Sequence, residues 1–209
     1  MDKQSQKLTT RVEQMIKKTR AAGQTVKNKR RRKQIEEALK KQKKLYMNEY
    51  QEALYMTMSV MEAYDQDMMI PFLGFGAKLP PFYSISSSCF AVNGDIFNPE
   101  SHGTMGLLDT YAKGIMKLQQ HGPSQFSGVI DFATQFVGQE PVSQDNQFYS
   151  ILVILTNGEN QDKEETVDKI VEASEYPISI IIVAVGGGDI SAIRFLDGEQ
   201  GPLVHSDKT

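Results

Sequence analysis

The sequence of 209 residues is poor in cysteine and in long apolar runs. Its single cysteine, Cys89, excludes an internal disulfide and favours an intracellular compartment. Nothing near Cys89 in the sequence would activate the thiol, so we expect an inert structural residue. The longest apolar stretch, residues 178–185 with Ser179 as its one polar residue, is too short to span a bilayer. The N-terminus lacks the apolar core of a secretory signal. We therefore expect an intracellular protein, either cytoplasmic or membrane-peripheral.

The sequence also lacks the motifs of common enzymes. It has no Walker-type phosphate loop, and no glycine-rich dinucleotide motif opens a helix after a strand. The histidines His102, His121 and His205 are far apart and lack metal-ligand spacing. Ser124 and Ser127 have no nucleophile-elbow context. We therefore expect neither an enzyme nor a small-molecule substrate.

The net charge of −3 conceals a strong asymmetry along the chain. Residues 1–50 hold 16 Lys and Arg against 5 Asp and Glu, a net charge of +11. Residues 51–209 hold 7 against 21, a net charge of −14. A basic arm is thus joined to an acidic domain. This charge asymmetry bears on which partners the chain can bind, and not on its fold.

The basic arm, residues 1–45, is rich in Lys and Gln and has no apolar run, so we expect a helical or disordered extension. Its basic cluster consists of Lys27, Lys29, Arg30, Arg31, Arg32 and Lys33. The cluster is compatible with a nuclear localisation signal, or with a patch that binds nucleic acid or anionic membrane. The simpler interpretation is a solvated, partly disordered arm, since short basic runs are common and this one has no interleaved aromatic residues for base stacking.

Apolar periodicity predicts an alternation of helices and strands in the rest of the chain. The predicted helices cover residues 50–65, 102–120, 126–137, 162–174 and 189–197, and the main predicted strands cover residues 69–75, 151–155 and 178–185. The strand 151–155 is an unbroken apolar run, and the strand 178–185 is interrupted only by Ser179. Such sequences are typical of strands buried on both faces of a parallel sheet. Asp162 and Glu165 are predicted to cap the helix 162–174. The fold class is therefore α/β with a mostly parallel sheet.

A polar triplet, Thr156-Asn157-Gly158, directly follows the strand 151–155. In open α/β sheets, ligands bind at the carboxyl ends of the strands. The triplet is therefore a candidate site.

Five segments carry a family resemblance: YDQDMMIPFLGFGAKLPP, FAVNGDIFNPE, HGPSQF, SILVILTNGEN and PISIIIVAVG. Their order and spacing over residues 46–201 resemble the von Willebrand factor A-like domain of copines. The resemblance implies a Rossmann-like, doubly wound, mostly parallel sheet in residues 46–209. It further implies a non-enzymatic module that binds other proteins through the top face of this sheet.

In this family, three loops at the top of the sheet hold a divalent metal ion. The resemblance maps Ser124 onto the second loop, in place of a threonine, and Asn157 onto the third loop, in place of an aspartate. The D-x-S-x-S motif of the first loop is absent from the sequence. We therefore expect a degenerate metal-ion-dependent adhesion site that binds Mg²⁺ or Ca²⁺ weakly at most, and no other cofactor.

The strand that precedes the first loop is missing as well. The resemblance would place it between the strands 69–75 and 151–155. Either these two strands close against each other, or another segment fills the gap, or the chain is a truncated copine product without independent function. The family's calcium-dependent phospholipid-binding domains are also missing, so calcium-driven membrane docking is not implied. The alternative function is anchoring to anionic membrane or nucleic acid through the basic arm.

Overall fold

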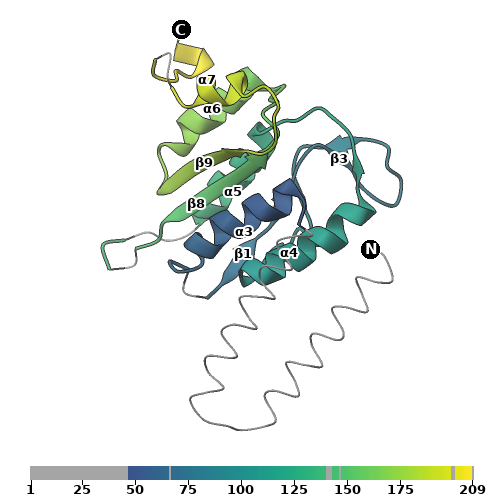
Figure 1. The fold of residues 1–209 in the computed structure, drawn as a ribbon. Helices are drawn as coiled ribbons and strands as arrows, with labels where there is room; N and C mark the ends of the chain where they lie inside the picture. Colours follow the sequence, from purple (N-terminus) through teal and green to yellow (C-terminus); the bar gives the residue numbers. More distant parts are fainter. Residues whose placement is uncertain (1–46, 66, 140–142, 146, 199–200, 209) are drawn as a thin grey trace, which may run out of the picture. The chain divides into compact units, whose positions relative to one another are not determined.

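The computed structural model describes residues 47–208, apart from residues 66, 140–142, 146 and 199–200 (Figure 1). The chain divides into two units, Met1–Met47 and Asn48–Thr209. All elements below belong to the second unit. The predicted N-terminal arm, including its basic cluster from Lys27 to Lys33, lies outside the described residues.

Helices form where the apolar periodicity predicts them. The α-helices are α3 (Glu49–Met61), α4 (Gly103–Gly114), α5 (Ser127–Gln139), α6 (Lys163–Ala173) and α7 (Ser191–Leu196), and two short 3-10 helices are η1 (Ile115–Lys117) and η2 (Ser206–Lys208). None of the helices in the described part of the chain is both long and apolar enough to cross a membrane. Helix α4 is shorter than predicted because the chain tightens into η1 and then becomes extended.

Helix α3 begins with a reciprocal cap. The Asn48 side chain accepts the Gln51 backbone N–H at 2.8 Å, and the Gln51 side chain accepts the Asn48 backbone N–H at 3.1 Å. These bonds satisfy two amides that the start of a helix leaves unpaired. Leu54 and Leu107 are buried, and α3 packs against α4.

The strands form four small sheets rather than one. They are β1 (Met69–Pro71), β2 (Leu73–Gly74), β3 (Ala77–Lys78), β4 (Ser86–Ser87), β5 (Phe90–Ala91), β6 (Glu100–His102), β7 (Gln119–Gln120), β8 (Ser150–Thr156) and β9 (Ile178–Ala184). Among the described residues, only β8 and β9 pair in parallel, and the other pairs are antiparallel. The α/β class is confirmed, whereas the mostly parallel, Rossmann-like arrangement is not. The reason is that residues 69–102 reverse direction through tight turns, which join antiparallel strands.

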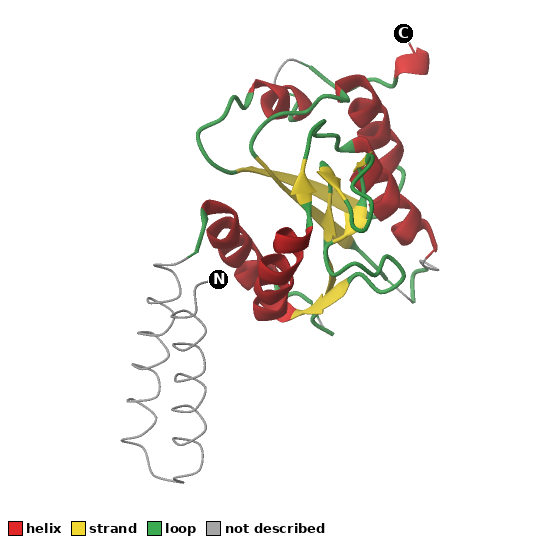
Figure 2. Cartoon of the chain, turned by 90° about the vertical axis from the view of Figure 1, so that its right-hand side faces the viewer, coloured by secondary structure: helices red, strands yellow, loops and turns green. Residues whose placement is uncertain are grey.

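One face of the β8–β9 sheet packs against α5 and α6. Leu152 and Ile154 of β8 and Ile180 and Ile182 of β9 alternate onto this face. They border a core that includes the fully buried Phe126 at the start of α5. Figure 2 shows helices on both sides of the strands.

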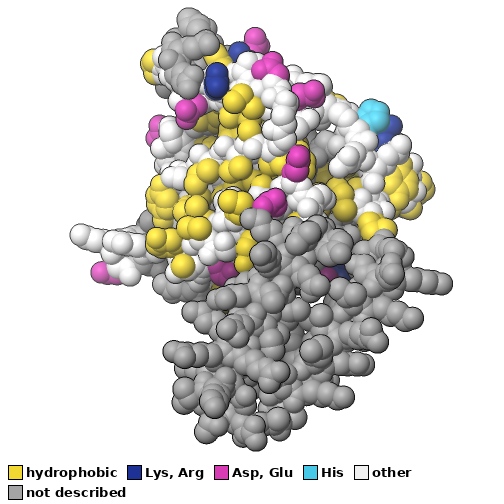
Figure 3. Space-filling view, viewed as in Figure 1, with side chains coloured by type: hydrophobic (Ala, Val, Ile, Leu, Met, Phe, Trp, Pro, Cys, Tyr) yellow, Lys and Arg dark blue, Asp and Glu magenta, His cyan; other side chains and the backbone are white. Residues whose placement is uncertain are grey.

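The prediction that β8 and β9 are buried on both faces is wrong. On the second face, 43% of Ile151 and 36% of Ile181 remain exposed. Helix α3 contacts β8 but leaves much of this face open, and Figure 3 shows hydrophobic side chains gathered there. An apolar run indicates that a strand can be buried, but not whether another element covers it.

The predicted gap beside β8 persists in the described part of the chain. There β8 pairs only with β9, and β1 pairs only with β6. Strands β1 and β8 therefore do not pair with each other, and no described strand pairs with both of them. On the β9 side of β8, the Ser150 backbone N–H donates to the Pro177 carbonyl, and the Thr156 carbonyl accepts the Val185 backbone N–H. Alternate residues of a parallel strand bond to opposite sides, so the backbone groups of Ile151, Val153 and Leu155 face the edge without a ladder.

Candidate functional site

The candidate site lies at the carboxyl ends of β8 and β9. Thr156 ends β8 and is 2% exposed. Its hydroxyl accepts the backbone N–H of Gly158 at 3.3 Å, and its carbonyl accepts the backbone N–H of Val185 at 2.7 Å. The start of the Thr156-Asn157-Gly158 loop is thereby fixed to the neighbouring strand.

Two glycines allow the loops after β8 and β9 to touch backbone to backbone. A Cβ atom on Gly158 would overlap the carbonyl oxygen of Asp189, and a Cβ atom on Gly188 would overlap the carbonyl oxygen of Asn157. Gly158 also has a φ of +110°, which favours glycine. The triplet is therefore a rigid turn, held from both sides.

The side chain of Asn157 is exposed and makes no hydrogen bond within the described part of the chain. Because the flanking backbone is held, this amide projects from a fixed position. Asn157 is thus the residue of the triplet that is available to a ligand.

The structure brings the loop of Ser124 next to the segment that follows the triplet. The Ser124 carbonyl accepts the backbone N–H of Gln161 at 2.8 Å. The Ser124 hydroxyl is half-buried and bonds to none of the described residues. The structure therefore joins the two predicted loops through backbone, without a direct bond between the Ser124 and Asn157 side chains.

Asp162 is the buried carboxylate at this end of the sheet, at 9% exposure. It is the residue immediately before α6, where a cap was predicted, but its side chain makes no cap bond to the backbone of that helix. Instead it accepts the backbone N–H groups of Phe126 and Ser127, both at 3.0 Å, and the Thr166 hydroxyl at 2.9 Å. The prediction that Asp162 caps its own helix is therefore corrected: it caps the start of α5. The bonds from Phe126 and Ser127 to Asp162 also hold the end of the Ser124 loop in place.

Asp189 is a second carboxylate near the triplet, and no motif in the sequence pointed to it. It accepts the backbone N–H of Ser191 at 2.9 Å and the Ser191 hydroxyl at 3.0 Å. These two bonds, with a smaller contribution from Arg194, hold the pKa of Asp189 below its usual value. Its position beside Gly158 depends on the packing of two loops, which no local pattern reports.

Taken together, the predicted site residues offer one hydroxyl oxygen and one amide oxygen. Both are neutral, whereas Mg²⁺ is usually bound through one or two carboxylates. Within the described residues, no group of three or more His, Cys, Asp or Glu side chains is arranged to hold a metal ion. The donor set therefore fits a divalent cation poorly.

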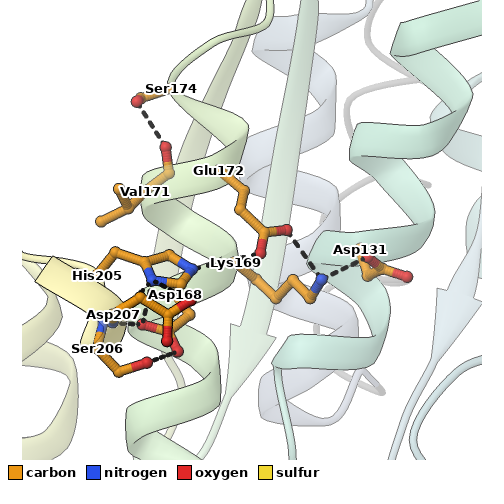
Figure 4. Close-up of polar contacts among 9 residues, drawn as sticks. All are labelled: Asp131, Asp168, Lys169, Val171, Glu172, Ser174, His205, Ser206 and Asp207. Carbon is orange, nitrogen blue, oxygen red and sulfur yellow. Dashed lines mark hydrogen bonds and ion pairs between the residues drawn. The ribbon is translucent and has the colours of Figure 1, made fainter.

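A separate polar cluster fastens the C-terminal residues to the outer side of α6 (Figure 4). The Asp168 carboxylate accepts the Ser206 backbone N–H at 2.8 Å and the Ser206 hydroxyl at 2.7 Å. His205 lies 3.6 Å from Glu172 and 3.9 Å from Asp168. We call this arrangement the C-terminal clasp.

Lys169 joins α6 to α5 beside the clasp. Its ammonium group lies 2.8 Å from Glu172 and 3.0 Å from Asp131 (Figure 4). These two carboxylates hold the pKa of Lys169 well above its usual value. The lysine therefore stays charged and is not a candidate general base.

These observations define an α/β protein with a rigid polar loop cluster at the carboxyl ends of two parallel strands. The family is shown by sequence comparison: the chain belongs to the copine family, whose family model matches residues 38–209. The chain is similar to Copine-A of Dictyostelium discoideum, with 38% identity over 157 residues. The match covers 75% of this chain and 26% of Copine-A, so the chain spans about a quarter of that relative's length.

Proposed function

We propose that this chain is a non-enzymatic protein-interaction module of the copine type. Its binding surface is the pair of loops that carry Ser124 and Asn157. The observation that carries the proposal is the exposed Asn157 amide, which has no partner in the described part of the chain and projects from a backbone held by Gly158 and Gly188. Because the backbone of this loop is already held, little backbone freedom is lost when a partner binds, which favours recognition.

We further propose that the metal site is degenerate and that the partner binds without a metal ion. Ser124 and Asn157 supply only neutral oxygens, and the Asp162 carboxylate is already occupied by three donors. Asp189 is exposed, but Ser191 engages both of its oxygens. Mg²⁺ or Ca²⁺ would therefore bind weakly, and a partner would meet hydroxyl and amide groups directly.

The test first uses this chain as bait to capture a partner protein. The affinity of the captured protein for this chain is then measured by titration. The wild-type chain is expected to bind its partner equally well with Mg²⁺ and with a chelator, and S124A/N157A is expected to weaken the binding about tenfold, since two polar contacts are lost. N98A, which changes an exposed residue of another loop, is the matched control. Loss of binding in the chelator, or micromolar Mg²⁺ binding by calorimetry that S124A/N157A abolishes, would contradict the degenerate site.

A second candidate function rests on the net charge of +11 in residues 1–50. Such an arm would bind nucleic acid or anionic membrane through counterion release, so the affinity should fall steeply with salt. Replacing the basic cluster from Lys27 to Lys33 by glutamine in the full chain should reduce both the affinity and its salt dependence. An unchanged salt dependence would exclude this cluster as the anchor.

A further inference from the structure

The turn between β3 and β4 exposes large apolar side chains. We define the hairpin tip as residues 80–85. Phe82 is 86% exposed and Ile85 is 81% exposed. The tip is held in place because the Tyr83 hydroxyl donates to the Lys117 carbonyl at 3.1 Å. The apolar side chains are therefore displayed by a fixed turn, on a stretch where a soluble surface would normally be polar.

The two chain segments that carry the hairpin tip and its neighbouring strand β7 contain no acidic residue. Residues 68–94 and 110–130 contain no Asp or Glu, although residues 51–209 carry a net charge of −14. The two segments lie side by side, because β3 pairs with β7 and the His121 backbone N–H donates to Gly76 at 3.0 Å. Figure 3 shows hydrophobic side chains next to basic and histidine side chains on the flank where Figure 1 draws β3.

Three of the seven Lys and Arg residues of the acidic domain lie in these two segments. Lys113 is paired with Asp109. Lys78 lies on β3, and Lys117 is exposed at the end of η1, next to the exposed Met116. Within the described residues neither Lys78 nor Lys117 forms an ion pair, so both remain available to an anionic partner.

We propose that the hairpin tip inserts into the interfacial layer of a phospholipid bilayer that carries anionic headgroups. Phe82 and Ile85 would enter the boundary between headgroups and acyl chains, and Lys78 and Lys117 would meet the phosphates. Apolar side chains flanked by cations are the pattern of a monotopic membrane contact. The contact needs no calcium, since no carboxylate takes part in it.

A bilayer fits this surface better than a folded protein does. The apolar groups sit at the end of a projecting turn, with Lys78 further back on the strand. A fluid bilayer adapts to such a tip, whereas a protein would need a matching groove. The acidic remainder of the domain does not prevent the contact, because charges further than about 8 Å from the membrane are largely screened at physiological ionic strength.

The test measures binding of the full chain to phosphatidylcholine vesicles with and without phosphatidylserine. High salt suppresses the contribution of the basic arm, so the binding that persists reports on apolar insertion. F82S/I85S is expected to lower this residual binding about tenfold, because two apolar side chains are lost from the interface. F97S is the matched control: Phe97 is 97% exposed, but its backbone N–H binds the Asp95 carboxylate, so it lies beside a negative charge.

Two further variants separate insertion from other modes of binding. In F82W the indole fluorescence should shift to the blue on vesicles and be quenched by brominated lipid, while F97W should show neither effect. K78E/K117E should weaken binding to vesicles with phosphatidylserine at low salt. Binding that high salt abolishes completely, equal binding of F82S/I85S and F97S, or an unquenched F82W would each overturn the proposal. Interaction of the tip with a partner protein and not with vesicles would overturn it as well.

Discussion

Gly158 and Asp189 meet backbone to backbone at the carboxyl ends of β8 and β9. The approach is so close that a Cβ atom on Gly158 would overlap the Asp189 carbonyl oxygen. This contact, with its counterpart between Gly188 and Asn157, fixes the loop that presents the Asn157 amide. A substitution that disturbs this contact should therefore change both the stability of the fold and the position of the Asn157 loop.

Replacing Gly158 by alanine should lower the free energy of unfolding by about 2–4 kcal/mol. The cost combines a φ of +110°, which a side chain rarely adopts, with the overlap at Asp189. Chemical denaturation measures the difference. Gly187 is the matched control, because a Cβ atom there meets nothing within 4 Å, so G187A should change stability by less than about 0.5 kcal/mol. Equal losses in both variants would refute the close contact.

Asp162→Asn should destabilise the protein by about 2–3 kcal/mol. The substitution removes the charge and turns an NH₂ group toward one of the donors that Asp162 now satisfies, most directly the Phe126 or Ser127 amide. A buried donor left without an acceptor costs its full desolvation. Denaturation curves check the stability, and hydrogen exchange at Phe126 and Ser127 checks the site. The corresponding change at the exposed Asp189 should cost much less, and a reversed order would contradict the assignment.

The sequence predicted the elements well because each depends on neighbouring residues. Helical spacing placed α3 and α6, and the predominantly apolar stretches 151–155 and 178–185 placed β8 and β9. The sequence failed where distant segments decide the outcome. Asp162 serves a helix that begins 35 residues earlier, and its own neighbourhood looked like an ordinary cap. Whether Ile181 is covered likewise depends on elements elsewhere in the chain.

The site residues were selected through family resemblance, and the structure adds their setting. Ser124 and Asn157 lie on loops that the Gln161 backbone joins. Neither the clamp around Gly158 nor the position of Asp189 could be predicted, because both arise from contact between two loops. What the sequence did indicate was the absence of a carboxylate on the mapped loops.

Cys89 should react more slowly in the folded chain than in the unfolded chain. Burial, and to a smaller extent Asp131, raises the pKa of its thiol, so less thiolate exists at mildly alkaline pH. Alkylation rates as a function of pH, with and without denaturant, measure this effect. The midpoint should lie at higher pH in the folded state, and D131N should lower it slightly. A lower midpoint in the folded state would show an activated thiol and contradict the structural assignment.

The C-terminal clasp should open in acid. Hydrogen bonds from the Ser206 side chain and backbone hold the pKa of Asp168 below its usual value. The clasp is therefore fully stabilised above the unfolded pKa of about 3.9 and is lost as the pH falls through the lower folded pKa. Hydrogen exchange or amide chemical shifts of Ser206 report the opening. In D168N the transition should disappear, and its persistence would assign the acid sensitivity to another carboxylate.

The exposed face of β8, and its edge that pairs with no described strand, should make the chain prone to self-association. Ile151 and Ile181 are exposed on strands that carry no charged residue, and the backbone groups of Ile151, Val153 and Leu155 face an edge without a ladder in the described residues. Natural sheets protect such edges with charge, commonly lysine. I151K and I181K should therefore reduce concentration-dependent light scattering without loss of folded structure. Met105 is also exposed but lies on α4, whose backbone is internally bonded, so M105K should have little effect. An equal reduction in M105K would assign the association to surface charge in general, and not to the exposed strand.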